Sequence, residues 1–163
     1  MTEQPAPVDD PVATERQLES FIVKFTPEIA ALTRAARARL RQRMPEAIEL
    51  VYDNYNALAI GFASSEKTSH VAISLAVYSS GPLLYFYYGA ALADPMGLLR
   101  GSGNQGRHIR LTSMDVFDEP GVDALIGAAI DHGRLPMPTS GGGYTIIRSI
   151  SAKQRPRRPK EQA

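Results

Sequence analysis

The sequence predicts an α+β fold, with an antiparallel sheet of about five to six strands and helices packed on one of its faces. Three observations lead to this fold class. Two helical segments open the chain, several short alternating strands follow in a block, and one further helix precedes a late strand. Because the strands follow one another without intervening helices, antiparallel pairing is expected rather than a parallel βαβ arrangement.

The stretch from Val71 to Ala90 carries the strongest strand signal in the chain. Two β-rich runs lie on either side of residues 79–82, whose sequence SSGP is typical of a turn. Side chains alternate between the two faces of a strand, so each run has two sides. One side is largely aliphatic and should be covered by helices: Val71, Ile73, Leu75, Val77, Leu84, Phe86 and Tyr88. The other side combines small residues with tyrosines: Ala72, Ser74, Ala76, Leu83, Tyr85 and Tyr87.

Two helices are expected before the strands. A capping box at residues 14–17 (TERQ) should begin the first, which carries apolar residues at helical spacing. Thr26 followed by Pro27 is the start signal of the second helix, and Pro45 ends it. Its arginines could bind phosphate, although we favour a solvent-exposed helix face. These residues are Arg34, Arg37, Arg39, Arg41 and Arg43.

The remaining elements are predicted by the same patterns. Residues 48–52 and 57–62 should form strands before the central stretch, and residues 107–113 alternate after it. A helix should begin at Pro120, since the apolar residues that follow recur at the spacing of one helix face. A last strand is expected at residues 144–150.

Length and composition predict one domain. The 163-residue chain should fold over residues 14–151, with disordered tails at residues 1–13 and 152–163, the second of them basic. The absence of cysteine excludes disulfides, thiolate metal sites and cysteine nucleophiles. No apolar run approaches the roughly 18 residues of a membrane span, and the N-terminus lacks the pattern of a signal peptide. We therefore expect no membrane association and a bacterial-type, cytoplasmic protein.

A glycine-rich segment at residues 101–106 (GSGNQG) matches the pattern of dinucleotide-binding loops. That pattern must follow a strand and open a helix, whereas this one leads into an alternating strand. A turn whose amides hold an anion, beside Arg100, Arg107 and Arg110, is the alternative to a simple loop. The chain contains neither a zinc signature nor a nucleophile elbow, so we assign no catalytic residue and expect no cofactor.

The second face of the sheet is the candidate binding site. Its small residues would form a floor, beside which tyrosines and cationic side chains rise. Cationic side chains near free amides favour a small anionic group, such as a carboxylate or a phosphate. The same face could instead form a homodimer interface, or be covered by residues 144–150. The candidate ligand-binding residues are Tyr85, Tyr87, Arg107, His108 and Arg110.

Three segments resemble the YdhG-like domain family, bacterial proteins mostly of unknown function. They are residues 24–62 (KFTPEIAALTRAARARLRQRMPEAIELVYDNYNALAIGF), 94–111 (DPMGLLRGSGNQGRHIRL) and 146–158 (IIRSISAKQRPRR). The resemblance, which spans roughly residues 20–155, implies a frataxin-like α+β fold. It also implies an iron-chaperone role for one line of the family, which needs carboxylates on the first long helix and the adjoining strand. The metal-ligating residues would then be Glu46, Glu49 and Asp53.

These observations rank the functions. A non-catalytic module that binds a small ligand or a partner through the second sheet face comes first. A frataxin-like iron-binding protein is the alternative. Nucleic-acid binding through the arginine-rich helix and the basic tail ranks below both, and an enzyme ranks last.

Overall fold

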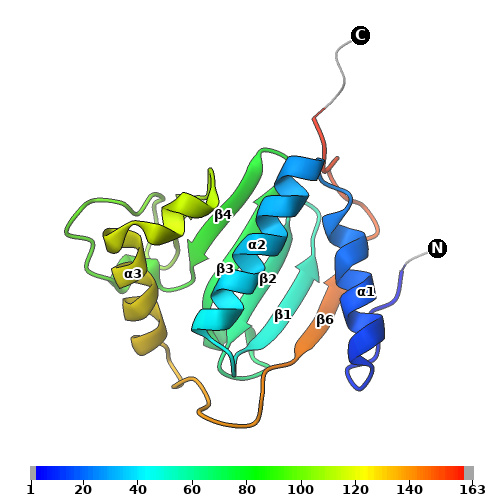
Figure 1. Cartoon of the computed structure of the whole chain (residues 1–163), viewed down its shortest axis with the longest axis horizontal. Coiled ribbons are helices and arrows are strands. Elements are labelled where there is room, and N and C mark those ends of the chain that lie inside the picture. The colour runs from blue at the N-terminus through cyan, green and yellow to red at the C-terminus, as the bar shows by residue number, and fades with distance from the viewer. Residues whose placement is uncertain (1–2, 160–163) are drawn as a thin grey trace.

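A computed structural model describes residues 3–159 and has an α+β architecture. Across these residues the chain forms three α-helices, a six-stranded sheet and three short 3-10 turns (Figure 1). The helices are α1 (Pro11–Ile22), α2 (Pro27–Arg43) and α3 (Pro120–Asp131). The strands are β1 (Ile48–Asp53), β2 (Leu58–Ala63), β3 (Val71–Tyr78), β4 (Gly81–Phe86), β5 (Arg107–Arg110) and β6 (Thr145–Ile150). None of the described helices combines the length and the apolar character needed to cross a membrane.

The strand order is β5-β4-β3-β2-β1-β6. Strands β1 to β5 pair antiparallel with their neighbours, whereas β6 pairs parallel with β1. The expectation of a purely antiparallel sheet was therefore wrong, and the sheet is mixed. The physical reason is the long connection through α3, which carries the chain from the β5 edge to the opposite edge. A crossover of this length allows parallel entry, which a tight hairpin does not.

All three helices cover the same face of the sheet (Figure 1). The side chains that β2, β3 and β4 direct towards the helices are fully buried and form the main core with α1, α2 and α3. The prediction of an aliphatic, helix-covered side is confirmed for five residues of the central stretch. These are Ile73, Leu75, Val77, Leu84 and Phe86.

At the start of β3 the predicted alternation fails. Ala63 pairs with Val71 but Phe62 pairs with Ile73, so a β-bulge shifts the register there. Val71 consequently joins a separate apolar cluster on the open face, and Ala72 joins the main core. These two assignments were wrong because one extra residue in a strand reverses the faces on one side of it.

The N-terminal segment is more ordered than the sequence suggested. Helix α1 begins at Pro11, because the Asp10 side chain accepts a hydrogen bond from the Ala13 N–H at 3.0 Å and caps it. Gln17, expected to close a capping box with Thr14, instead accepts from the Ala6 N–H at 2.6 Å. The described part of the tail therefore contacts α1. Residues 1 and 2 lie outside the described part.

The C-terminal segment after β6 also contacts the domain. Residues 151–158, here called the C-terminal strap, run along the turn between β1 and β2. The Ser151 N–H donates to the Asp53 carbonyl and the Arg155 N–H to the Tyr55 carbonyl, each at 2.8 Å. Arg157 is buried, with 5% of its surface exposed. The expected disordered tail was thus wrong for the strap; residues 160–163 lie outside the described part.

Candidate ligand-binding face

A shallow cavity of about 410 Å³ lies on the face of the sheet opposite the helices. Small residues from the two central strands form its floor, and tyrosines from β1, β3, β4 and the turn after β4 form its walls. The floor residues are Ala59, Gly61, Ser74 and Ala76. The wall residues are Tyr52, Tyr78, Tyr85 and Tyr87. This open face is the second face that the alternation pattern predicted.

Strand register explains why the floor is low. Ala59 lies opposite Ala76, and Gly61 lies opposite Ser74, so two cross-strand pairs of small residues meet at the sheet centre. Tyr52 flanks this floor on β1, where it lies opposite Ala59. Adjacent strands lie about 4.8 Å apart, so the cavity between β1 and β4 is roughly 14 Å across.

The tyrosine walls are held in place by contacts with one another and with nearby polar groups. The Tyr85 and Tyr87 rings meet edge to face, with centroids 6.4 Å apart. The Tyr52 hydroxyl shares a hydrogen bond with the Thr68 hydroxyl at 2.5 Å. Burial, with a smaller contribution from neighbouring Tyr88, raises the pKa of Tyr87. A phenol that stays protonated can donate a hydrogen bond to a ligand.

His108 and Arg110 lie on the edge strand β5, beside the tyrosines. His108 pairs with Tyr85, and Arg110 pairs with Leu83, so both residues share the open face as the sequence predicted. Neither residue lines the cavity itself. The Arg110 guanidinium donates to the Ser80 carbonyl at 3.5 Å and is exposed. Both candidates therefore lie outside the cavity on its β5 side, and Arg110 lines a separate cavity with Ser80 and the first turn of α2.

Arg107 does not join this group. It occupies the alternate position on β5, opposite Phe86, and its guanidinium donates to three carbonyls of the glycine-rich loop. The distances are 3.1 Å to Ser102, 3.0 Å to Gly103 and 2.7 Å to Gly106. Arg107 thus stabilises the loop, and we withdraw it from the candidate ligand-binding residues.

Packing also accounts for one glycine of the loop. A Cβ at Gly106 would lie 1.8 Å from the Tyr85 hydroxyl oxygen, so only glycine fits there without displacing the tyrosine. The loop therefore contributes to the open face by positioning the Tyr85 ring. The other two glycines of the pattern, Gly101 and Gly103, have φ values of 120° and 89°, a backbone conformation that favours glycine.

The three candidate metal ligands form hydrogen bonds with different partners and do not share one site. Glu49 is buried on β1 and accepts hydrogen bonds from Arg37, at 2.7 Å, and from Arg41. Asp53 is buried four residues further along the strand, about 13 Å away. Glu46 accepts a hydrogen bond from the Gly142 N–H. Within residues 3–159, no three Asp, Glu or His side chains gather closely enough to hold a metal ion.

All five arginines of α2 form ion pairs with carboxylates on other elements, which sequence reasoning missed. The pairs tie α2 to α1, to β1, to the 3-10 turn over Met114–Asp118 and to α3. They are Arg34 with Glu19, Arg37 with Glu15 and Glu49, Arg39 with Asp118, Arg41 with Glu49, and Arg43 with Asp123. The expected solvent-exposed face of α2 is therefore an ion-pairing face, and phosphate binding there would have to displace these pairs.

Residues 144–150, considered as a cover for the second face, extend the sheet instead. Strand β6 pairs with β1 at the sheet edge, so it lies beside the cavity rather than over it. Sequence reasoning also missed the walls Tyr52 and Tyr78. A signal for Tyr52 was present in the sequence. Tyr52 lies two residues after Leu50 on β1, so the strand period places both side chains on the same face, where they belong to one apolar cluster.

Searches of this chain against protein-family models, curated proteins and solved structures found no match. The resemblance to the YdhG-like domain, with its frataxin-like fold and iron-chaperone role, therefore stays a prediction from the sequence.

Proposed function

We propose that this protein is a non-catalytic binding module whose open sheet face holds a small ligand with a flat apolar body. The observation that supports this proposal is the cavity itself, a floor of small residues between tyrosine walls. Its volume of about 410 Å³ falls within the range of about 300–1,000 Å³ typical of small-ligand sites.

The chemistry of the walls indicates the shape of the ligand. Tyrosine rings bury flat apolar surface and keep a hydroxyl available for hydrogen bonds. The floor of Ala59, Ser74 and Ala76 offers no bulky side chain, so a planar group can lie against the strands there, while the Val71 side chain packs over Gly61. An acidic substituent directed towards β5 would meet His108 and Arg110, consistent with the small anionic ligand predicted from the sequence.

A thermal-shift assay with 2-naphthoate, naphthalene-2-methanol and inorganic phosphate tests this function. We expect both naphthalene probes to raise the melting temperature of the wild type, and 2-naphthoate to do so at lower concentration. The variant Ala76→Leu, which fills the cavity, should lose both responses. Arg110→Ala should lose only the preference for the carboxylate, and Arg16→Ala, an exposed change on α1, should behave like the wild type.

Equal stabilisation of the wild type and Ala76→Leu, or no stabilisation by either naphthalene probe, would remove the cavity as a ligand site. Sedimentation of both proteins checks the homodimer alternative. A dimeric wild type that becomes monomeric in Ala76→Leu would assign the face to self-association instead.

A further inference from the structure

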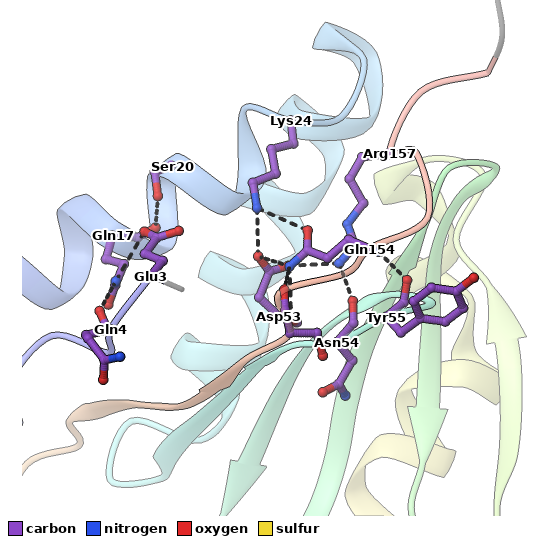
Figure 2. Close-up of polar contacts among 11 residues, drawn as sticks. Glu3, Gln4, Gln17, Ser20, Lys24, Asp53, Asn54, Tyr55, Gln154 and Arg157 are labelled. Carbon is purple, nitrogen blue, oxygen red and sulfur yellow. Dashed lines mark hydrogen bonds and ion pairs between the residues drawn. The ribbon is translucent and has the colours of Figure 1, made fainter. Parts of the chain in front are cut away.

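The C-terminal strap is anchored by a buried ionic cluster beneath it. Figure 2 shows Lys24, Gln154 and Arg157 converging on Asp53. The donor distances to the Asp53 carboxylate are 2.8 Å from Lys24, 2.9 Å from Gln154 and 2.9 Å from Arg157. Arg157 also donates to the Asn54 carbonyl at 2.6 Å. These bonds use the inward-facing side chains of the strap and hold it against the turn between β1 and β2.

Three other cations of the strap lie on the surface, and one of them, Arg158, donates to the Lys24 and Val23 carbonyls. Lys153 and Arg155 are exposed, and within residues 3–159 neither forms an ion pair with a carboxylate. The Arg155 guanidinium lies 5.7 Å from the centroid of the Tyr55 ring, which is itself 49% exposed. Residues 132–159 contain no Asp or Glu in the sequence. The strap therefore presents fixed positive charge next to an exposed aromatic ring.

The strap meets the cavity of the open face at the turn between β1 and β2. The strap bonds directly to Asn54 and Tyr55, and Asn54 lines the cavity beside Tyr52. Arg155, over the Tyr55 ring, thus lies at the turn that supplies the cavity-lining Asn54, and His108 lies beside Tyr85 on the β5 side. Aromatic rings on an uncovered sheet, bordered by cations, are the arrangement on which single-stranded nucleic acids stack their bases.

The arginines of α2 offer no comparable surface. Each already pairs with a carboxylate, so a phosphate would gain little net charge there. An acidic protein would be attracted to the strap cations, but it would make no use of the flat tyrosine walls. The combination of cations at the end of the sheet and stacking surfaces on its open face favours a nucleic acid.

From this placement we infer that the ligand of the open face is a single-stranded nucleic acid. Its bases stack on Tyr52, Tyr85 and Tyr87, and its phosphates contact Lys153 and Arg155. The inference rests on the proposed function, since it names the ligand class of the same cavity.

Fluorescence anisotropy with a labelled oligothymidylate and a labelled oligouridylate of about ten nucleotides tests this inference. The wild type should bind both strands, with an affinity that falls as salt increases. In Lys153→Ala/Arg155→Ala, two phosphate contacts are lost, so the slope of log K against log[salt] should become shallower by about 1.4. Tyr85→Ala should lower affinity roughly 5- to 150-fold, the effect of removing one stacked base.

The matched control is Arg39→Ala/Arg43→Ala, which removes the same charge from α2 and should leave the salt slope unchanged. If the slope of log K against log[salt] changed equally in both double variants, the salt dependence would follow from the net charge of the protein and not from phosphate contacts at the strap. That result would overturn the inference. Thymidine monophosphate binding as tightly as the ten-nucleotide strand would overturn it as well.

The two proposals can fail separately. Stabilisation by 2-naphthoate without oligonucleotide binding would leave the ligand cavity in place and reject the nucleic acid. Oligonucleotide binding that Ala76→Leu does not weaken would reject the open face as its site. Because Lys153 and Arg155 are exposed and take no part in the Asp53 cluster, their removal should not unfold the protein, which circular dichroism verifies.

Discussion

The two faces of the sheet are built from the same strands but have different chemistry. On β1, Glu49, Val51 and Asp53 face the helices and are buried, whereas Leu50 and Tyr52 belong to the open face. The helix-covered face is filled by large aliphatic and aromatic side chains, together with two carboxylates held by cations. The open face has a floor of small residues between tyrosines. Stability therefore comes mainly from the first face, which leaves the second free to bind.

The largest expected effect is on the buried ionic cluster of the helix-covered face. Asp53→Asn removes the charge that Lys24 and Arg157 share, and it leaves a buried guanidinium without its counter-ion. We expect a loss of about 3–5 kcal/mol in the free energy of unfolding, measured by urea denaturation. The neighbouring open-face change Tyr52→Phe removes one hydrogen bond and should cost about 1 kcal/mol. Equal losses would mean that Asp53 contributes no more than a surface group.

The contributions of the two faces to stability can be compared at two adjacent residues of β3. Leu75→Ala empties a fully buried position under the helices and should destabilise the protein by about 2–5 kcal/mol. Ser74→Ala, one residue away on the cavity floor, should cost well under that, because its hydroxyl makes only a 3.4 Å contact with the Leu75 carbonyl. Thermal and urea unfolding of both variants would measure the difference. Similar losses would contradict the assignment of faces.

A third prediction concerns the tight packing on the open face. Gly106→Ala places a methyl group where the Tyr85 hydroxyl lies and should cost about 1–3 kcal/mol through overpacking. Tyr85→Leu removes the ring, so Gly106→Ala should be nearly neutral in that background. A double-mutant cycle by urea denaturation measures this coupling. If the effects of the two substitutions on the free energy of unfolding were additive, the added methyl group would not be clashing with the Tyr85 side chain.

The smallest expected effect is the pH dependence of the stability that the ion pair between Glu15 and Arg37 contributes. The hydrogen bond from Arg37 lowers the pKa of Glu15 below its ordinary value of 4.5. A lowered pKa means that the stabilisation is present above pH 4.5 and is lost as the pH falls through the lower, folded-state value. Because Glu15 is half exposed, we expect this pair to contribute well under about 1 kcal/mol to the free energy of unfolding. Glu15→Gln should flatten the stability profile below pH 4.5 in urea titrations, and an unchanged profile would contradict this.

Much of the candidate site followed from local pattern. The alternation of β3 and β4 separates Leu75 and Phe86 from Ser74 and Tyr85, and the alternation of β5 places His108 beside Tyr85. These predictions succeed because the direction of a side chain on a strand depends on its position relative to its neighbours. The start of α2 could also be predicted from the sequence, because Thr26 caps the helix and Pro27 occupies its first position.

Only the tertiary structure decided the features that depend on residues distant in the chain. Strand β6 enters parallel to β1, and the bulge that moves Val71 to the open face arises from pairing with β2. The arginines of α2 find their carboxylates up to 80 residues away, and Arg157 reaches Asp53 across 104. Charge patterns cannot reveal such partners, because an ion pair depends on which elements the fold brings together. For the same reason, a tail that looked free in the sequence became an ordered segment, held by Asp53 against the turn between β1 and β2.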